Sequence, residues 1–344
     1  MLRPARGLDP VDAYALATVG LWAAWVFATS TWTGRFPPPS WTPLLAPAVL
    51  LAGVVVGRLG RRWRDHPGTL VLLLFPLVAL LPGVGLRMAR GPLPLGYANA
   101  NTAAATQVMA LLALAALDER EDRARRNLLW VGIVVAAWMV VHHGSLAGIA
   151  TAVPVLGAIL LMASRPARRS GWALVVALVS VVAASASLLW LAARPTWPPR
   201  VLTAFDPVRK VMWEEALGLW ARRPITGSGV GSYAEVNPYA HDTDTIAAHS
   251  SLLQTGAELG LVGVALLFGI VLAGAAVAHR GRAPLAVVAL AAWTALWIHS
   301  LVDHLFDYPT VPFLSGAVLG WASASSARPG DPVDAVRTVP RPPG

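Results

Sequence analysis

The chain has 344 residues, of which 56% are hydrophobic and only 13% are charged, and its mean hydropathy is +0.58. An ordinary soluble domain carries about 25% charged residues, so this composition argues against a soluble globular protein. Cysteine is absent, which excludes disulfides and thiolate metal sites. The net charge of +9 does not indicate a nucleic-acid surface, because no clustered basic face with readout groups is present.

Apolar segments of a length that can cross a bilayer recur along the whole chain, each rich in Leu, Val and Ala. We therefore predict an all-α polytopic integral membrane protein, with a single membrane domain over residues 1–326. The first segment follows Arg3 and Arg6 and lacks a clear cleavage site, so we expect an uncleaved anchor. The ten predicted spans are roughly residues 12–30, 41–59, 69–86, 97–117, 128–144, 146–163, 171–193, 249–278, 283–301 and 308–325.

The basic residues predict the orientation. With the N-terminus in the cytoplasm, 18 of the 27 Lys and Arg residues fall in cytoplasmic segments, and the short outer loops hold Arg35, Arg87 and Arg90. Long loops cross the membrane regardless of charge and do not count. We predict that both termini are cytoplasmic. The Pro-rich polar tail, residues 327–344, is predicted to be disordered.

Residues 194–248 form the one long extracytoplasmic loop, and it contains a predicted short amphipathic helix. Asp206 suits a helix cap, and Pro224 suits a helix stop. Arg209, Trp213 and Trp220 would share one face of this helix. A guanidinium beside two indoles suits a phosphorylated sugar. The alternative is an interfacial helix anchored by its Trp side chains.

The run GSGVGS follows this helix and contains Gly227, Gly229 and Gly231. It lacks the Gly-Lys-Ser/Thr of a Walker loop, and no strand precedes it as a dinucleotide fold requires. A flexible turn is the alternative to a ligand-binding loop.

Polar residues gather near the outer ends of the last spans. His249 begins a span, and Glu258 lies roughly 13 Å deeper on the same helix, where an ionisable group usually faces a protein interior. His299 and Asp303, and then Asp303 and Asp307, are spaced i, i+4. Such pairs can orient a general base or bind a metal. A structural hydrogen-bonded cluster is the alternative.

Taken together, these segments resemble the O-antigen ligase and polymerase family. RKVMWEEALGLWARRPITGSGVGSY is similar to its Arg-x3-Trp … Pro-x2-Gly-x-Gly-x-Gly block. HSSLLQTGAELGLVG is similar to its His-Asn-x2-Leu-x4-Glu-x-Gly-x2-Gly motif, with one spacing variation. The matching residues in the second motif and elsewhere are His249, Leu252, Glu258, Gly260, Gly263, the acidic and His residues at 299–307, and Asn101.

Three features depart from the family pattern. Where members often carry Ser-Arg-Gly, the sequence HHGSLAGIA keeps Ser145 but lacks the Arg that helps to hold the donor diphosphate. Ser250 stands in place of the Asn that follows the key His. The ten predicted spans are also fewer than the family's usual number of about twelve.

The resemblance implies a metal-independent glycosyltransferase, without cofactors, in the bacterial cytoplasmic (inner) membrane. It would transfer a glycan from a polyprenyl diphosphate to a sugar hydroxyl on the outer face, in surface polysaccharide assembly. The acceptor would belong to a glycan, lipid or protein, and membrane lipids would be partners but nucleic acids would not. The polyprenyl chain would lie in a groove between spans, where the Gly256-x3-Gly260 spacing allows close helix packing.

The resemblance also implies residue roles. Arg209 would stabilise the leaving diphosphate, His249 would act as general base, and Glu258 would orient neighbouring groups. The remaining expected substrate contacts are Arg200, Trp213, Trp220, Arg222, Arg223, Gly227, Gly229, Gly231, His299 and Asp303.

Two other functions remain open at the level of sequence. One is a transporter of a lipid-linked or polar solute, which would favour broken helices near the bilayer midplane. The other is a non-catalytic member of a glycan-assembly complex, which the missing mid-chain Arg favours.

Overall fold

The computed structural model describes residues 9–85, 97–119, 122–241 and 245–324, and within these ranges every regular element is a helix. The all-α prediction is therefore confirmed. The predicted tail, Arg87 and Arg90 lie outside the described residues. The helices are α1 (Pro10–Trp32), α2 (Thr42–Arg62), α3 (Pro67–Gly85), α4 (Ala98–Asp118), α5 (Arg123–His142), α6 (Leu146–Ser164), α7 (Gly171–Ala192), α8 (Pro199–Phe205), α9 (Pro207–Arg222), α10 (Ser232–Val236), α11 (Ser251–His279), α12 (Ala283–Ser300), the short 3-10 helix η2 (Leu305–Asp307) and α13 (Thr310–Ser323).

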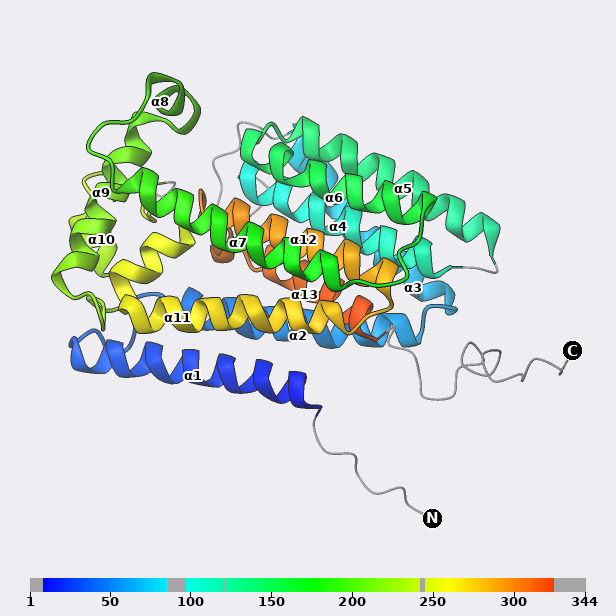
Figure 1. The fold of residues 1–344 in the computed structure, drawn as a ribbon, viewed down its shortest axis with the longest axis horizontal. Coiled ribbons are helices and arrows are strands. Elements are labelled where there is room, and N and C mark those ends of the chain that lie inside the picture. The colour runs from blue at the N-terminus through cyan, green and yellow to red at the C-terminus, as the bar shows by residue number, and fades with distance from the viewer. Residues whose placement is uncertain (1–8, 86–96, 120–121, 242–244, 325–344) are drawn as a thin grey trace, which may run out of the picture.

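The long helices run along one axis, and α8, α9 and α10 gather at one end of the bundle (Figure 1). Among the described residues, eight helices are long and apolar enough to cross a membrane, and Pro67–Leu81 and Thr310–Ser323 are shorter apolar helices. Each predicted span coincides with one of these helices, although the count of ten spans stays a prediction. The start of α1 and the end of α13 both lie at the end opposite α8–α10.

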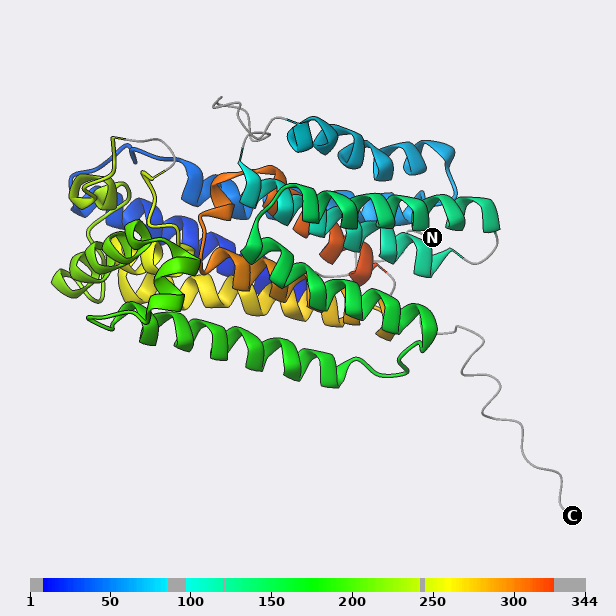
Figure 2. The same cartoon turned by 90° about the horizontal axis from the view of Figure 1, so that it is seen from above.

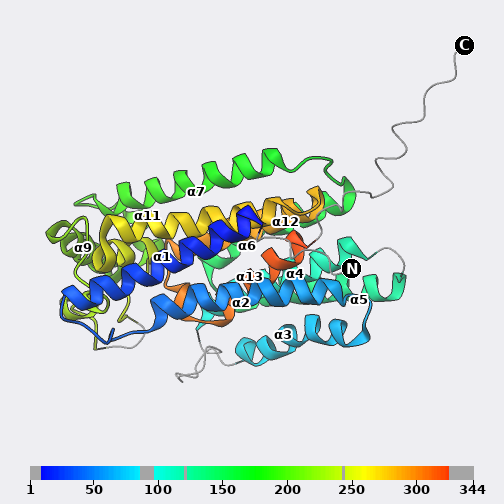
Figure 3. The same cartoon turned by 90° about the horizontal axis from the view of Figure 1, so that it is seen from below.

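Helix α4 lies at the centre of the bundle, and nearly all of its residues are buried. It packs against α3, α5, α6, α12 and α13. Figure 3 shows α7 along one edge and α3 along the opposite edge, with α4 between them, and the view in Figure 2 agrees. The many Ala and Thr side chains of α4 let its neighbours approach closely. This central helix carries Tyr97 and Asn99 at its N-terminal end, where the site described below is found.

Helices α2 and α13 make a close contact through glycines. A Cβ atom on Gly53 would lie 2.1 Å from the Phe313 carbonyl oxygen, and one on Gly316 would lie 2.1 Å from that of Leu50. Such backbone approach is typical of small-residue helix interfaces in membranes. The contact fixes α13, and with it the loop over residues 301–309 that precedes α13.

Arginine–carboxylate pairs join helices at the other end of the bundle. The Asp118 side chain is 1% exposed and pairs with Arg61, Arg64 and Arg282 at 2.9 to 3.1 Å. Asp12 likewise holds arginines from α2 and α11. Part of the basic excess that predicts the cytoplasmic side is thus used to tie helices together.

Candidate active site

Helix α11 is broken at Gly260, where the backbone has φ 66° and ψ −166°. The preceding loop bonds to two carbonyls and two amides at the break, and Trp25 Nε1 of α1 donates to the Leu259 carbonyl at 2.9 Å. The amides of Ser228 and Gly229 donate to the carbonyls of residues 257 and 258, at 3.0 and 2.8 Å. The amides of Leu261 and Val262 donate to the carbonyls of residues 224 and 225, at 2.8 and 3.3 Å. The loop over residues 224–229 therefore replaces one turn of α11.

The glycines of this loop are required by its geometry. Gly227, Gly229 and Gly231 all have positive φ, which disfavours other residues. A Cβ atom on Gly227 would lie 2.3 Å from the Glu258 carbonyl oxygen. Since the amides of residues 227–229 donate to protein oxygens, the geometry supports a structural role for these glycines in place of the predicted substrate contact.

Glu258 explains why the loop takes this position. Its buried carboxylate accepts hydrogen bonds from the backbone amides of Gly231 and Tyr233 and from the Gln254 side chain. The interaction agrees with the expectation that Glu258 orients its surroundings rather than contacting His249.

Helix α9 forms as predicted, and the Asp206 side chain caps it by accepting from the Val208 amide at 2.9 Å. Trp213 is fully buried, with its ring centroid 5.1 Å from that of Trp197. Trp220 donates from Nε1 to the Pro224 carbonyl. Its ring covers Gly256, where a Cβ atom would lie 2.4 Å away, so this glycine does allow close packing.

These positions do not suit the sugar-stacking roles expected for the two indoles. Trp213 has no exposed ring face, because α9 turns it into the hydrophobic core. Trp220 packs its ring against α11. Amphipathic spacing alone does not distinguish a core-facing indole from a ligand-facing one, which is why the sequence suggested binding.

Arg209 is the cation that the structure brings to the polar cluster. It lies in the first turn of α9, donates to the Val302 carbonyl, and has Nη2 3.8 Å from Asp303 Oδ2. Arg200 is exposed on α8. Arg222 and Arg223 are exposed at the far end of α9, about 20 Å along the helix from Arg209. The lesser candidates are therefore not part of this cluster.

Asp303 is the centre of the cluster, and its side chain is 1% exposed. Oδ1 accepts from the Tyr97 hydroxyl at 2.6 Å and from its neighbour's backbone amide at 2.8 Å, and Oδ2 accepts from the Asn99 amide. His249 Nδ1 and His304 Nδ1 lie 3.4 and 3.0 Å from Oδ1. A single buried carboxylate thus joins groups from α4, the start of α11 and the loop after α12.

His249 lies directly before α11 with φ 47°, a left-handed conformation that is rare for a residue with a Cβ atom. Such strain is often found at functional sites. Ser250 caps α11, because its side chain accepts a hydrogen bond from the Leu253 amide at 3.4 Å. Ser and Asn are about equally good caps. The replacement of the family's Asn by Ser250 therefore preserves the local structure that positions His249.

The electrostatics of the cluster favour an ionised Asp303 and a protonated His304. Burial alone would raise the pKa of Asp303, but hydrogen bonds from His249 and His304 hold it well below its usual range. Burial would lower the pKa of His304, but the hydrogen bond to Asp303 and its charge raise it. Burial and then the charge of Asp303 raise the pKa of Tyr97, so this hydroxyl stays a donor.

His299 does not join this cluster through the predicted i, i+4 pair. Helix α12 ends at Ser300, so Asp303 lies in the loop and turns to His249 and His304. His299 is 2% exposed, and its Nε2 has no hydrogen-bond partner among the described residues. Asp307 lies in η2 and is exposed. The predicted i, i+4 pair does not form, because α12 ends before it reaches Asp303.

The same groups are suitable metal ligands. One ligand atom each from His249, Asp303 and His304 lie within 4.8 Å of one another, and all three residues are buried. Two imidazoles and a carboxylate are a common donor set for zinc. The geometry therefore fits both possibilities that the sequence leaves open, a carboxylate-oriented base and a metal site.

Sequence reasoning missed Tyr97 and Asn99 as partners of Asp303. The signal was present, because the polar run GYANAN opens an otherwise apolar span. The family resemblance points to Asn101, but that residue is buried one half-turn further along α4. The contact joins residues about 200 positions apart, which the sequence does not reveal.

A family model described as O-antigen ligase matches residues 131–268. The match includes α9 with Arg209, the glycine loop, His249 and Glu258, and it confirms the resemblance that the motifs indicate. Tyr97, Asp303 and His304 lie outside it. A comparison with curated proteins finds no match.

Proposed function

With the similarity of residues 131–268 to the O-antigen ligase family as the premise, we propose that this protein is a glycosyltransferase of surface polysaccharide assembly. It transfers a glycan from a polyprenyl diphosphate to a sugar hydroxyl, at the end of the bundle that holds α8, α9 and α10. The membrane-spanning helices supply the setting that a lipid-linked donor requires.

The chemistry is a substitution at the anomeric carbon of the donor. The acceptor oxygen forms the new glycosidic bond as the bond to the diphosphate oxygen breaks, and polyprenyl diphosphate leaves. The acceptor hydroxyl gives its proton to His249. No redox partner or metal is needed for this balance of atoms and charge.

Asp303 makes His249 suitable as the base. With Nδ1 directed at the buried carboxylate, Nε2 is the nitrogen that takes the acceptor proton. The ionised Asp303 then stabilises the imidazolium that forms, as carboxylate partners of catalytic imidazoles do. Tyr97 and Asn99 hold the carboxylate in place by hydrogen bonds.

Arg209 supplies the positive charge for the leaving diphosphate. Among the described residues, it is the basic side chain that pairs with Asp303, and it approaches from α9. A fixed guanidinium beside the reacting groups offsets the negative charge that develops on the leaving group. Its position also supports a function without the mid-chain Arg that the family often carries.

A groove between α6 and α7 suits the polyprenyl chain. It holds about 440 Å³ of water-accessible space, and small or apolar residues of α12 form its floor. The groove reaches Ile298, one turn before Val302, whose carbonyl accepts from Arg209. An isoprenoid chain in this groove would end with its diphosphate near that guanidinium.

The observation that carries the proposal is the buried Asp303 carboxylate between His249 and Arg209. The test is mass spectrometry of lipid-linked glycans in a strain that lacks the gene. We expect the donor to accumulate, wild type and His66→Ala to clear it, and His249→Ala to fail at equal expression. His66 is an exposed histidine at the other end of the bundle and serves as the matched control. Clearance by His249→Ala at the wild-type rate would contradict the proposal.

A further inference from the structure

A second opening in the membrane domain reaches the same cluster from the other side. This cleft lies between α1, α2, α11 and η2, and it holds about 100 Å³ of water-accessible space. His304 lines it directly, and the His304 ring packs against that of His249 at 4.4 Å between centroids. The cleft therefore leads to the proposed base without passing Arg209, which lies on α9.

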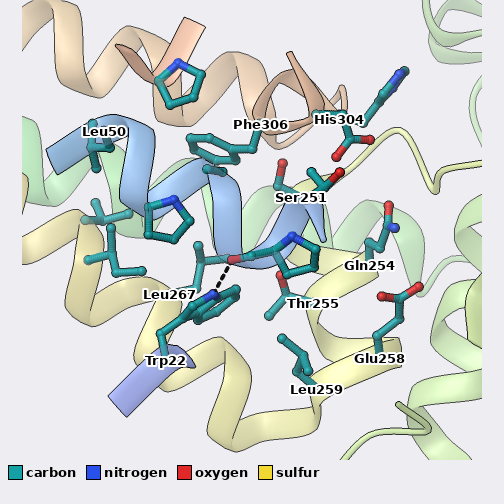
Figure 4. A pocket seen from close by; sticks show the side chains of 18 of the residues that line it. Trp22, Leu50, Ser251, Gln254, Thr255, Glu258, Leu259, Leu267, His304 and Phe306 are labelled. Carbon is teal, nitrogen blue, oxygen red and sulfur yellow. Dashed lines mark hydrogen bonds between the residues drawn. The ribbon is translucent and has the colours of Figure 1, made fainter. Parts of the chain in front are cut away.

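The cleft is polar at one end and apolar at the other. Ser251, Gln254, Thr255 and Glu258 line it along the first two turns of α11, whereas Leu267, Ile270 and Val271 line it deeper. Figure 4 shows these polar side chains on one side and Leu50, Leu267 and Trp22 on the other. The part of α11 after the break, from Leu261 to Val271, corresponds to about 15 Å of helix, about half the apolar thickness of a bilayer. Such a profile fits one molecule with a polar head and an apolar tail.

A hydrogen bond between α1 and α2 stabilises the apolar wall of the cleft. Pro47 lies inside α2 and cannot donate to the carbonyl of residue 43, four positions earlier. Trp22 Nε1 from α1 donates to this carbonyl at 2.6 Å instead. The bond joins α1 to α2 along the cleft, as the dashed line in Figure 4 shows.

The charge of the cleft selects its ligand. Glu258, Asp307 and His304 line the cleft, so two carboxylates accompany one imidazole, and no lysine or arginine lines it within the part of the chain that the structure describes. Carboxylates accept hydrogen bonds from sugar hydroxyls but repel phosphates. The donor diphosphate is thus favoured on the Arg209 side of Asp303, and a neutral hydroxylated head group is favoured on this side.

We propose that this cleft binds the acceptor, and that the acceptor is a membrane-anchored glycolipid with an uncharged, hydroxyl-bearing head group. The proposal rests on the proposed function, because it identifies the second substrate of the same site. An acceptor hydroxyl at the polar end would lie beside His304 and within reach of His249, whereas its lipid tail would follow α11 into the membrane.

The test uses lipid binding to the purified protein in nanodiscs, with no donor present. The probe is monoglucosyl diacylglycerol with a photoactivatable group in one acyl chain, and phosphatidylglycerol with the same chain is its anionic counterpart. Peptides that are cross-linked on illumination are identified by mass spectrometry. We expect the glucolipid to label cleft peptides of α2 and α11 about tenfold more than the anionic lipid does.

Two variants, each with a matched control variant, make the test specific. Ala46→Trp fills the cleft, because Ala46 lines it, and should abolish labelling by the glucolipid. Gly157→Trp adds the same side chain where nothing lies within 4 Å and should leave labelling unchanged. Asp307→Arg should shift the preference to the anionic lipid, whereas Asp65→Arg, at an exposed carboxylate of the other end, should not.

Equal labelling of the cleft by both lipids, or labelling of α3 alone, would overturn the proposal. The first result would assign the cleft to bulk membrane lipid, and the second would show that the glucolipid does not enter the cleft. The readout does not depend on transfer, so a protein that proves inactive toward the donor but selects the glucolipid would contradict the proposed function and leave a glycolipid site in this cleft without its role as the acceptor site.

Discussion

Asp303 determines the arrangement of the site at the scale of single residues. It lies outside every long helix, yet it collects hydrogen bonds from α4 and faces His249 at 3.4 Å. Tyr97 and His304 complete this environment, and Tyr97 also stacks on Tyr308 with 5.0 Å between the ring centroids. A buried carboxylate with this many donors is a rigid partner for an imidazole.

Substitution of the proposed base, His249, should lower the transfer rate strongly, and substitution of its partner Asp303 should lower it nearly as much. His249→Ala is expected to lower the transfer rate by roughly 10²- to 10⁴-fold, and Asp303→Asn by at least about 10²-fold, since each removes general-base catalysis. Arg209→Ala should lower the transfer rate by a similar factor, because the charge on the leaving diphosphate is then no longer stabilised. Rates are measured from the decay of the lipid-linked donor in membranes with equal protein content. If His249→Ala and Arg209→Ala both stayed within about tenfold of wild type, the mechanism would be wrong.

The donor set of His249, Asp303 and His304 gives a prediction about metals. Transfer should continue in EDTA, because the proposed chemistry requires no metal. Added zinc should inhibit by binding the imidazoles, and His304→Ala should weaken this inhibition. The measurement is the transfer rate against zinc concentration. A requirement for zinc that EDTA reveals would replace the base mechanism with a metal mechanism.

His304 and Asp303 also predict how stability depends on pH. Because the pKa of His304 is raised in the folded protein, the stability that His304 contributes is fully present below the ordinary pKa of 6.5. This stability is lost as the pH rises through the raised pKa. Because the pKa of Asp303 is lowered in the folded protein, the stability that Asp303 contributes is present above the ordinary pKa of 3.8. This stability is lost as the pH falls through the lowered pKa. The pair therefore stabilises the folded protein most between pH 3.8 and 6.5.

The check is the melting temperature of wild type against His304→Gln in detergent. The difference should be largest at about pH 5 and should shrink as the solution becomes alkaline. A difference that grows toward alkaline pH would show that His304 is neutral in the folded protein.

At the scale of elements, the break in α11 and the glycine loop form one unit. The loop supplies the hydrogen bonds that the broken turn lacks, and the Glu258 carboxylate binds the amides at the end of the loop. This unit holds α9, with Arg209, against the half of α11 that begins after His249. The position of cation and base relative to each other therefore depends on the glycines.

Substitutions of two glycines by alanine should affect the stability of the protein differently. Gly227→Ala should destabilise the protein by more than about 1–2 kcal/mol, because positive φ is costly for alanine and the new Cβ atom meets Glu258. Gly157→Ala, inside α6 with open space around it, should be neutral or stabilise by about 0.5–1 kcal/mol. Melting temperatures in one detergent compare the two. A tolerant Gly227 would mean that the loop is not fixed as described.

The elements show what sequence can and cannot predict. Apolar segments predict the helices, and Asp206 and Pro224 predict the bounds of α9 closely. The break at Gly260 was not predicted, because the apolar pattern continues through it and only the loop and Trp25 bond to the exposed backbone groups. The core position of Trp213 and the pairing of Tyr97 with Asp303 depend on tertiary contacts, which one sequence does not contain.

At the scale of the whole molecule, two clusters built on buried carboxylates lie at opposite ends. The Asp118 cluster joins arginines of α2 and of the loop before α12 at one end, and the Asp303 cluster lies at the other. The groove between α6 and α7 reaches Ile298 of α12, whereas the separate cleft along α11 is lined by His304, the neighbour of Asp303. This separation suits two lipid-bound substrates that approach from the membrane independently.

Removal of the Asp118 carboxylate tests whether the Asp118 cluster stabilises the folded protein. Asp118→Asn leaves three arginines without their partner and should destabilise the protein by about 3 kcal/mol. Asp65→Asn, at a side chain that is 83% exposed, should change stability little. Thermal melting of the detergent-solubilised proteins distinguishes the two, and equal melting temperatures would show that the cluster is not structural.

The most direct measurement follows the fate of the donor with purified protein in vesicles that contain polyprenyl-diphosphate glycan and a membrane-lipid extract. Transfer predicts that each glycan joined to an acceptor releases one polyprenyl diphosphate, with wild type and not with His249→Ala, as measured by mass spectrometry. Movement of intact donor across the vesicle membrane, with no polyprenyl diphosphate released, would contradict a transferase and indicate a transporter.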